Sequence, residues 1–454
     1  MKPTFRAAAG AAVLAVTLAA CGGGSSSEGG GGDAGQPEGQ ITYWLWEAAQ
    51  LQAYQSCQKA FEAKNPKIKV KVEQYGWDDY WSKLTTGFVS GTAPDVFTDH
   101  LAKYPEFANK GQLEPLDKYI ERDKVPTNIY QPGLADLWVT EDKKRYGLPK
   151  DWDTIAIFYN KKMVKDAGIS EQQLQNLTWN PKDGGTYEKV IARLTVDKNG
   201  KRGDEPGFDK NNVKVYGLGL ESSGGNNAGQ GQWSMYAASN GWQATNKNPW
   251  GTHYNYDDPK VQETIAWWKG LIDKGYMNKL ETTVGVTPDT QMGAGKFALS
   301  TNGDWTISAY YGQKGVDIGT APTPIGPTGK RASMFNGLAD SIFIGSKKKE
   351  AAWQWVKFLA SPECQNLVGE KGVVFPATPE GTDVAAKKFA EKGVDVDAFT
   401  IHVKDKTTFL FPITDHAADI GAIMQPAMDA VMSGKAPVSS LTQANSQVNA
   451  LFGS

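Results

Sequence analysis

The sequence predicts an α/β protein built from two lobes. The chain has 454 residues, which is enough for at least two domains, each with its own hydrophobic core. Between residues 41 and 116, strand-like runs alternate with helical patterns, and this βαβ rhythm predicts a parallel sheet. Residues 154–159 form a continuous run of β-branched and aromatic residues, so we expect a strand that is covered on both faces.

Residues 146–160 mark the passage of the chain from one lobe into the other. Pro149 excludes a helix just upstream of the buried run, and Asp151, Trp152 and Asp153 lie directly before it. Two carboxylates and an indole at the beginning of a buried strand suggest a binding cleft. We therefore place residues 151–153 at the seam between the lobes, where a ligand would bind.

The first lobe is expected to begin with a strand over residues 41–46. A helix follows, in which Leu51, Tyr54, Cys57 and Phe61 recur at helical spacing, and Asn65-Pro66 ends it. The pattern then predicts a strand at 68–72, a helix at 80–88, a strand at 95–97 that runs into residues 98–100, and a helix at 104–109.

The remaining elements follow the buried run. We expect helices at 161–167, 187–195, 261–274, 349–359, 418–432 and 441–451, and strands at 213–220, 297–300 and 338–344, the last crossing back to the first lobe. Residues 196–201 predict a hairpin or exposed loop rather than a calcium loop, because the glycine comes too early and no glutamate closes the segment. Residues 221–232 lack the apolar side chains to pack themselves, so we expect them to face water or a ligand.

The amino terminus has the pattern of an export signal. Lys2 and Arg6 precede an apolar run at residues 7–20 that is too short to span a bilayer as a stable helix. Leu18-Ala19-Ala20-Cys21 resembles the lipobox of bacterial lipoproteins, in which Cys21 would become the lipidated first residue. An ordinary secretory signal with a chance cysteine is the alternative. Residues 21–40 are rich in glycine and serine and are expected to form a tether.

The net charge limits the kinds of partner the protein can bind, and the hydropathy of the chain indicates where it is located. Removing residues 1–20 takes away Lys2 and Arg6 and no acid, so 46 basic residues remain against 50 acidic ones, a net charge of −4. This balance argues against a nucleic-acid partner. No other apolar run approaches 18 residues, so we expect the body of the protein to lie outside the cytoplasm, held at the cell membrane by the lipid, on its extracellular or periplasmic side.

Two further cysteines, Cys57 and Cys364, would lie in an oxidising compartment. A disulfide between them is the simplest interpretation, and two unrelated buried thiols are the alternative.

The sequence lacks the residue patterns of most catalytic and metal-binding sites. The four histidines, His100, His253, His402 and His416, are far apart and lack metal-ligand spacing, so neither a zinc enzyme nor another metal or cofactor site is expected. No serine has the glycine-flanked elbow of an α/β-hydrolase. The pair Asp151 and Asp153 could serve a secreted glycoside hydrolase, so that alternative stays open.

The remaining candidates for a functional site are aromatic and hydrogen-bonding side chains. The chain has 15 tryptophans and 17 tyrosines. Several tryptophans follow or interrupt polar segments: Trp44, Trp46, Trp77, Trp152, Trp233, Trp242 and Trp305. Indole rings stack on the C–H faces of sugars, and carboxylates accept hydroxyl hydrogen bonds. As a group, these residues predict a sugar-binding cleft.

The sequence resembles the extracellular solute-binding proteins of ABC importers, in the sugar-binding group that includes maltose-binding proteins. The residues that carry the resemblance are Leu18-Ala19-Ala20-Cys21, Ala93-Pro94-Asp95-Val96, Tyr146-Gly147-Leu148-Pro149 with Phe158-Tyr159-Asn160, Asn302-Gly303-Asp304-Trp305, and the run of residues 347–361. They occur in the family's order over nearly the whole mature chain.

The resemblance implies a periplasmic-binding-protein-like fold with two discontinuous α/β lobes and crossing hinge strands. Lobe one would hold residues 41–152 and 340–376, and lobe two residues 153–339 and 377–454. Cys57 and Cys364 would then lie in the same lobe, which supports the disulfide.

The resemblance also implies a set of ligand-binding residues. Family ligand positions match Thr98, Asp99, His100, Asp153, Glu221 and Trp305, with Asn336 near the cleft floor. We expect Trp305 to be the main stacking surface, Asp99, Asp153 and Glu221 to accept hydroxyl hydrogen bonds, and Trp44, Trp46 and Trp152 to add further walls.

The predicted function is therefore that of a lipid-anchored, monomeric receptor that captures a sugar or oligosaccharide and delivers it to a membrane permease. No bond would be broken. A secreted glycosidase and a binder of a non-sugar solute are the alternatives.

Overall fold

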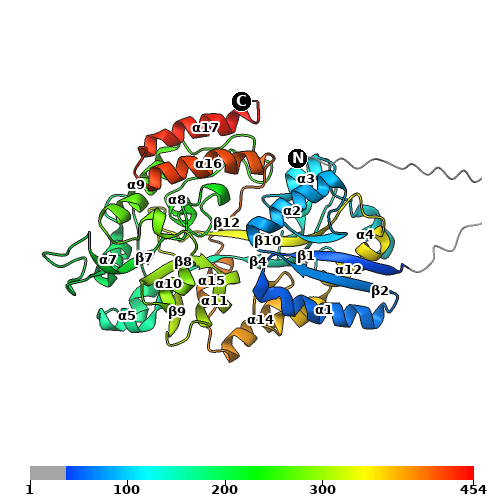
Figure 1. Ribbon diagram of the computed structural model, residues 1–454, viewed down its shortest axis with the longest axis horizontal. Coiled ribbons are helices and arrows are strands. Elements are labelled where there is room, and N and C mark those ends of the chain that lie inside the picture. Colours follow the sequence, from blue (N-terminus) through cyan, green and yellow to red (C-terminus); the bar gives the residue numbers. More distant parts are fainter. Residues whose placement is uncertain (1–36, 454) are drawn as a thin grey trace, which may run out of the picture. The chain divides into compact units, whose positions relative to one another are not determined.

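Two β-sheets organise the chain, of which the computed structural model describes residues 37–453 (Figure 1). The expected signal at residues 1–20, Cys21 and most of the tether lie outside the described residues. The first strand, β1 (Gly39–Leu45), begins two residues earlier than predicted, because it pairs with β2 (Ile68–Gln74) from Gly39↔Ile68 to Leu45↔Gln74. The segment available to a tether therefore ends before residue 39.

The first sheet has the strand order β11-β4-β10-β3-β1-β2, and β12 pairs with β10. Its other strands are β3 (Val96–His100), β4 (Leu148–Asp153), β10 (Ser333–Ile342), β11 (Phe375–Pro376) and β12 (Thr408–Leu410). β1 runs parallel to β2 and β3, as the βαβ rhythm predicted. The sheet is mixed rather than parallel, because β10 runs antiparallel to β3 and β4 as the chain returns from the second sheet.

The second sheet has the order β6-β7-β8-β5-β9, made by β6 (Val196–Asp197), β7 (Val213–Gly219), β8 (Phe297–Gly303), β5 (Ile155–Asn160) and β9 (Ile318–Ala321). Every residue of β5 is buried, and the strand lies between β8 and β9, so the predicted strand with two covered faces is confirmed. The predicted hairpin or exposed loop at residues 196–201 is a short hairpin, because Val196 pairs with Arg202 and the N–H of Asp197 donates to the carbonyl of Lys201 over 2.9 Å. The carboxylate of Asp197 accepts hydrogen bonds from the backbone N–H groups of Asn199 and Lys201 in this turn.

Helices cover both sheets, and in the view of Figure 1 α1 and α14 lie on one side of the first sheet and α2 and α3 on the other. Local sequence explains several helix ends. The Asn160 side chain caps α5 at the N–H of Met163, and Ser361 caps α13 at the N–H of Cys364. The α-helices are α1 (Leu51–Lys64), α2 (Trp77–Ser90), α3 (Tyr104–Asn109), α4 (Asp117–Asp123), α5 (Lys161–Asp166), α6 (Glu171–Gln175), α7 (Gly185–Leu194), α8 (Ser234–Ser239), α9 (Pro259–Asp273), α10 (Pro288–Gly293), α11 (Ile307–Tyr311), α12 (Lys349–Leu359), α13 (Pro362–Gly369), α14 (Pro379–Glu391), α15 (Asp397–Lys404), α16 (Ala417–Met432) and α17 (Leu441–Ala450), and the short 3-10 helices are η1 (Ala48–Gln50), η2 (Ala135–Trp138), η3 (Gly225–Asn227), η4 (Leu280–Thr282), η5 (Asp304–Thr306) and η6 (Val438–Ser440).

The two sheets meet where the chain crosses between them. β4 ends at Asp153 in the first sheet and β5 begins at Ile155 in the second, so Thr154 is the single residue between them. The return strand β10 is tied to the same point, because the hydroxyl of Ser333 accepts a hydrogen bond from the N–H of Ile155 over 2.7 Å. Residues 151–153 lie just before the buried strand β5, as expected, and they also form the end of a second strand, β4, which was not predicted.

A disulfide joins Cys57 on α1 to Cys364 on α13, with a Cα–Cα distance of 5.2 Å. The helix α14 packs on α13 and β11, and the indole N–H of Trp152 on β4 donates to Thr382 of α14 over 3.0 Å. Residues 379–391 therefore pack beside the first sheet. We therefore propose that residues 379–391 belong to lobe one, although the whole of residues 377–454 was expected in lobe two.

The polar stretch after β7 is covered more than its composition suggested. Ser223, Gly225, Gln230 and Gln232 are buried, so much of the segment does not face water, and the expectation that it faces a ligand stays a prediction. The cause is α16, whose backbone at Gln425 lies so close to Gly225 that a Cβ atom there would collide with it. Gly225 therefore supplies the close approach that covers the segment.

None of the helices found between residues 37 and 453 is long and apolar enough to cross a membrane.

Candidate functional site at the junction of the sheets

A chain of side-chain hydrogen bonds crosses the junction of the two sheets. The amide nitrogen of Asn336, on β10, donates to the carboxylate of Asp153 over 3.1 Å and lies 3.0 Å from Nε2 of His100, at the end of β3. From the other side, the amide of Gln230 donates to the second oxygen of Asp153 over 3.0 Å. The carboxylate at the end of β4 is therefore held from both sides of the junction.

Three of these four residues, His100, Asp153 and Asn336, were predicted site residues, and the structure brings them together. The fourth, Gln230, was missed because it lies in a glycine- and asparagine-rich segment whose folding depends on α16. Burial, together with the charge of Lys103, lowers the pKa of His100 to about 3, so its imidazole is neutral at pH 7.

Further carboxylates lie at the same junction. Asp304 follows β8 directly, is fully buried, and has a pKa raised well above its usual value by burial and by the charges of Asp153 and Asp151. Burial raises the pKa of Asp151 to about 7, and its carboxylate accepts the N–H of Leu338 over 3.1 Å. Burial also raises the pKa of Asp153 well above its usual value.

Glu221 lies just beyond the carboxyl end of β7, which runs parallel to β8, so Glu221 and Asn302 come to the same edge of the second sheet. Its carboxylate accepts from the amide of Gln232 over 3.2 Å and from that of Asn302 over 3.4 Å. Burial raises its pKa to about 7. Glu221 therefore combines an acceptor group with a partly exposed side chain.

Aromatic side chains border the hydrogen-bond chain on the first-sheet side. The ring of Trp46 packs edge-on against Trp77 with centroids 5.2 Å apart, and Trp77 lies 5.8 Å from the ring of His100. Trp81 adds a third indole 5.3 Å from Trp46. Trp77 is 41% exposed, which leaves much of an indole ring open to a ligand. Trp46 was predicted as a wall of the site, and Trp77 was named in the group of tryptophans that predicted a sugar-binding cleft, whereas Trp81 was not predicted.

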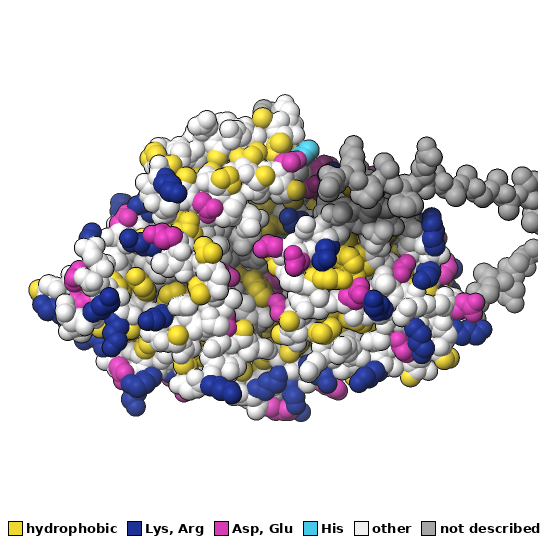
Figure 2. Space-filling view, in the orientation of Figure 1, with side chains coloured by type: hydrophobic (Ala, Val, Ile, Leu, Met, Phe, Trp, Pro, Cys, Tyr) yellow, Lys and Arg dark blue, Asp and Glu magenta, His cyan; other side chains and the backbone are white. Residues whose placement is uncertain are grey.

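Trp305 borders the junction from the second sheet. It is partly buried against the core of that sheet, and its ring lies over Gly303, where a Cβ atom would collide with it. Only glycine at position 303 allows this ring position. In the space-filling view a hollow runs between the part that carries α10 and β8 and the part that carries β1 and α12, with hydrophobic and acidic side chains along it (Figure 2).

Three predicted residues do not join this group. The indole of Trp44 turns to β2 and donates to Glu73 over 2.8 Å. Trp152 is 2% exposed because its ring is stacked between Phe335 and Phe375. These positions give no support to the predicted ligand contacts of Trp44 and Trp152.

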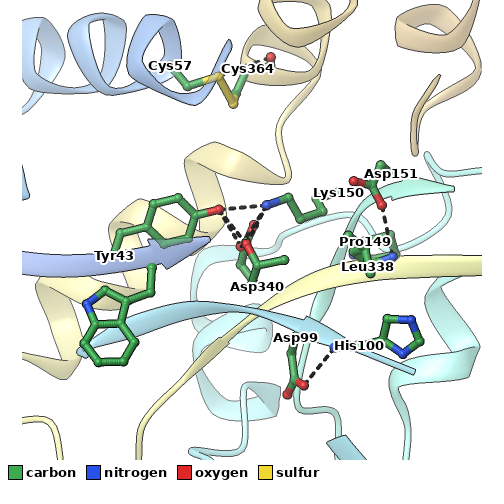
Figure 3. A network of polar contacts seen from close by, with 12 residues as sticks. Tyr43, Cys57, Asp99, His100, Pro149, Lys150, Asp151, Leu338, Asp340 and Cys364 are labelled. Carbon is green, nitrogen blue, oxygen red and sulfur yellow. Dashed lines mark hydrogen bonds and ion pairs between the residues drawn. A yellow bond between two sulfur atoms is a disulfide. The ribbon is translucent and has the colours of Figure 1, made fainter. Parts of the chain in front are cut away.

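Asp99 is the third. Figure 3 shows it on the opposite side of β3 from a group made by Tyr43, Lys150 and Asp340. Its carboxylate accepts the N–H of His100 over 2.8 Å, and burial raises its pKa to about 8. Asp99 thus positions the end of β3 through its bond to the N–H of His100, and its carboxylate is not part of the hydrogen-bond chain from His100 to Gln230.

A buried ion pair fixes the crossing strands beside the site. The ammonium of Lys150 on β4 lies 3.3 Å from the carboxylate of Asp340 on β10 and also contacts the hydroxyl groups of Tyr43 and Thr98 (Figure 3). Burial lowers the pKa of Lys150 and raises that of Asp340, so burial opposes both charges and the pairing sustains them. The pair sets the register of β4 against β10 rather than offering a binding surface.

The fold and the site together define a class of protein. Two sheets joined by crossing strands, with polar and aromatic groups gathered at the crossing, are typical of proteins that bind a ligand between two lobes. The sequence pattern of bacterial extracellular solute-binding proteins matches residues 57–396, which is most of the chain. The chain belongs to the bacterial extracellular solute-binding protein family.

Known proteins agree with this assignment. A Brucella abortus protein described only as a binding protein is 27% identical over 413 residues, covering 89% of this chain and 90% of its own. The maltooligosaccharide ABC transporter solute-binding lipoprotein of Streptococcus pneumoniae is 27% identical over 373 residues, covering 81% of this chain and 78% of its own. The ABC substrate-binding protein of Listeria monocytogenes in complex with cycloalternan superposes with a TM-score of 0.78 at 22% identity, covering 92% of this chain and 99% of its own.

Proposed function

We propose that this protein captures a sugar or oligosaccharide at the junction of its two sheets and delivers it to the membrane permease of an ABC importer. The family assignment supports capture of a solute outside the cytoplasm. The streptococcal relative, whose name describes a maltooligosaccharide transporter lipoprotein, supports a sugar. The chemistry of the junction supports the same ligand class, because indole rings and carboxylates are the groups that bind C–H faces and hydroxyls.

One observation carries the proposal: the hydrogen-bond chain from His100 through Asn336 and Asp153 to Gln230 joins groups from both sides of the junction. A hydroxyl-rich ligand can take over some of these bonds when the halves separate and close again. The same amides and carboxylates then contact the ligand instead of one another. Partly exposed indoles at Trp46, Trp77 and Trp305 flank the chain and would stack on the sugar ring.

Closure would follow the usual thermodynamics of a hinge. The crossing at Thr154 and the strand β10 are the connections on which the halves would turn. A ligand shifts the balance between open and closed forms only by the extra free energy of contacts that it makes in the closed form. The residues that contact both halves, above all Asp153, are therefore the ones through which a ligand would drive closure.

Release of the ligand unchanged is part of the proposal. A glycosidase needs a carboxylic acid and a carboxylate free to face the bond that is cleaved. Asp153 accepts from two side-chain amides, and Asp151 is 1% exposed with one oxygen on the N–H of Leu338. This arrangement favours binding over hydrolysis.

The anchor and partners belong to the same proposal. Acylation of Cys21 would hold the protein at the membrane, and a tether would keep the receptor within reach of the permease. We propose that the receptor acts as a monomer, with lobe one formed mainly by residues 41–152 and 340–376 and lobe two by residues 153–339 and the helices from α15 onward.

The test is isothermal titration of the purified mature protein against a panel of mono- and oligosaccharides, with product analysis of the same mixtures. We expect at least one sugar to bind with a change in tryptophan fluorescence and to be recovered intact. Cleaved sugar would support the glycosidase alternative, and binding of amino acids or peptides alone would overturn the sugar assignment.

A further inference from the structure

Asp304 is a buried carboxylate without a side-chain hydrogen-bond partner among the described residues. It is the first residue of η5, and its backbone N–H donates to the carbonyl of Thr154 at the crossing point over 3.2 Å. Its side chain is 0% exposed, and within residues 37–453 no side chain donates a hydrogen bond to either carboxylate oxygen. The backbone N–H groups of Trp305 and of Asp304 itself lower its pKa, but burial and the charges of Asp153 and Asp151 outweigh them. Buried polar groups are almost always paired, so this pair of oxygens points to a group that is supplied from outside the chain.

The groups that face Asp304 carry the same charge. Asp151 and Asp153, both on β4, act on its carboxylate through their negative charges. The two oxygens of Asp153 are occupied by the amides of Gln230 and Asn336, whereas one oxygen of Asp151 has no partner. Three carboxylates thus share a buried region, and their mutual repulsion adds to the cost of burial.

No cation of the described chain compensates this group. Across residues 37–453, neither Asp151, Asp153 nor Asp304 forms an ion pair. The charge of Lys150 reaches Asp151, but its ammonium is held by Tyr43, Thr98 and Asp340.

The other titratable groups at the junction do not supply a positive charge either. His100, which reaches Asp153 through Asn336, is kept neutral by burial, and Glu221 is a further acid. No cluster of three or more metal-binding side chains is found in the described part of the chain, so the three carboxylates are not arranged as the ligands of a metal ion.

A ligand at the junction would lie beside Asp304. The next residue, Trp305, presents a partly exposed indole ring over Gly303. Asp153, which acts on Asp304 electrostatically, is at the centre of the hydrogen-bond chain that joins the two sides. A sugar that stacks on Trp305 and bonds to Asp153 therefore has one edge towards Asp304.

We propose that the captured sugar is an amino sugar whose protonated amine pairs with Asp304. This inference rests on the sugar capture proposed above and names the class of sugar. An ammonium group brings three hydrogen-bond donors to two oxygens that no side chain of the described residues serves, and it brings the positive charge that the three carboxylates lack. A hydroxyl group in the same place brings a donor but no charge, so the matching neutral sugar binds more weakly.

Pairing with an ammonium group also moves a proton. A carboxyl group held protonated by burial and by its acidic neighbours gives up its proton when the cationic ligand arrives, and the proton passes to the buffer. Binding of a cationic sugar is therefore coupled to proton release, and binding of a neutral sugar is not.

The first test compares sugars that differ only in the amine. The pairs are glucosamine with glucose, galactosamine with galactose, mannosamine with mannose, and the β-1,4 disaccharide of glucosamine with cellobiose. Titration at pH 7 should show the amine-bearing member of at least one pair binding ten-fold tighter or more, and repetition in buffers of different ionisation enthalpy should reveal proton release. Neutral members that bind as tightly as their partners overturn the amine inference alone, whereas a panel in which no sugar binds overturns the proposed function as well.

The second test removes the charge. Asp304→Asn keeps the shape of the side chain, and we expect the affinity ratio of amine to neutral sugar to fall towards one. Asp257→Asn, an exposed control beyond the site, should keep the wild-type ratio. An unchanged ratio in a folded Asp304→Asn variant overturns the pairing. If that variant fails to fold, the proton-release measurement on the wild-type protein decides, because its absence overturns the proposal.

Discussion

Asn336 and Asp153 are joined twice, once through the sheet and once through their side chains. The two residues are opposite partners in the antiparallel pairing of β10 with β4, and the amide of Asn336 donates to the Asp153 carboxylate over 3.1 Å. The same amide nitrogen lies 3.0 Å from His100. One short side chain therefore holds the last residues of β3 and β4 in a fixed arrangement at the crossing.

Replacing Asn336 should weaken the free protein. In Asn336→Ala, the buried groups of Asp153 and His100 lose a partner, and an unsatisfied buried polar group costs about 1–3 kcal/mol. We expect urea unfolding at pH 7 to show a loss of this size in the free energy of unfolding. Asn211→Ala, at an exposed position, is the control, and equal stability of the two variants would contradict the structural role of Asn336.

Truncation of Trp305 should weaken sugar binding without unfolding the protein. The ring is partly exposed above Gly303, so Trp305→Ala removes a stacking surface worth about 1–3 kcal/mol, or ten-fold or more in affinity. Titration with the best sugar of the panel measures the effect. Phe208→Ala, on the distant β6–β7 hairpin loop, should bind as the wild type does, and an unchanged affinity in Trp305→Ala would remove Trp305 from the site.

The sequence predicted the elements better than the direction of the side chains. The apolar run of β5 and the helical periodicity of α1, α12 and α16 depend on local patterns, and these patterns were sufficient. His100, Asp153 and Asn336 could be predicted because a family resemblance matched His100 and Asp153 to ligand positions and placed Asn336 near the cleft floor. Gln230 and Trp81 could not, because their position depends on how distant segments pack, and Trp77 was named only as one member of an aromatic group.

β4 shows why side-chain direction was harder to predict. The pairing of β4 with β10 shifts between Leu338 and Ala339: Leu338 is opposite Asp151 and Ala339 is opposite Pro149, so Lys150 is an extra residue on β4. A bulge of this kind changes which side chains face each side of the sheet. It also accommodates Pro149 inside a paired strand. Pro149 is the only local sign of an irregular strand, and it does not fix which residue is extra, so Trp152 was expected at the cleft and instead lies between Phe335 and Phe375.

Asp99 should make stability depend on pH in a defined direction. Burial raises its folded-state pKa to about 8, against about 4 in an unfolded chain, so the folded protein binds the extra proton in that range. The stabilisation is complete below about pH 4 and is lost as the pH rises through about 8, with a slope of at most about 1.4 kcal/mol per pH unit.

Comparison with Asp99→Asn isolates this contribution from those of other buried groups. His100 and His402, whose pKa values are lowered to about 3, act with the opposite sign below about pH 6.5, so the measurement is best made between about pH 6.5 and about pH 8. The free energy of unfolding of Asp99→Asn should rise relative to the wild type across this range. A difference between the two proteins that stays constant would contradict the raised pKa.

The disulfide should stabilise the fold without taking part in binding. Cys57 and Cys364 are separated by 307 residues in sequence, and both are fully buried between α1 and α13. Neither cysteine belongs to the hydrogen-bond chain that includes Asp153 at the junction. Closing so long a loop restricts the unfolded chain, and loss of a natural disulfide typically costs about 2–5 kcal/mol. The double variant Cys57→Ala, Cys364→Ala should therefore unfold at a lower temperature by circular dichroism, while its sugar affinity remains that of the wild type.

Reductant should lower the unfolding temperature of the wild type but leave the double variant unchanged, because only the wild type has the bond. If both proteins melted together under oxidising conditions, the bond would contribute nothing to stability, and the packing of α1 on α13 would have to hold the two helices by itself.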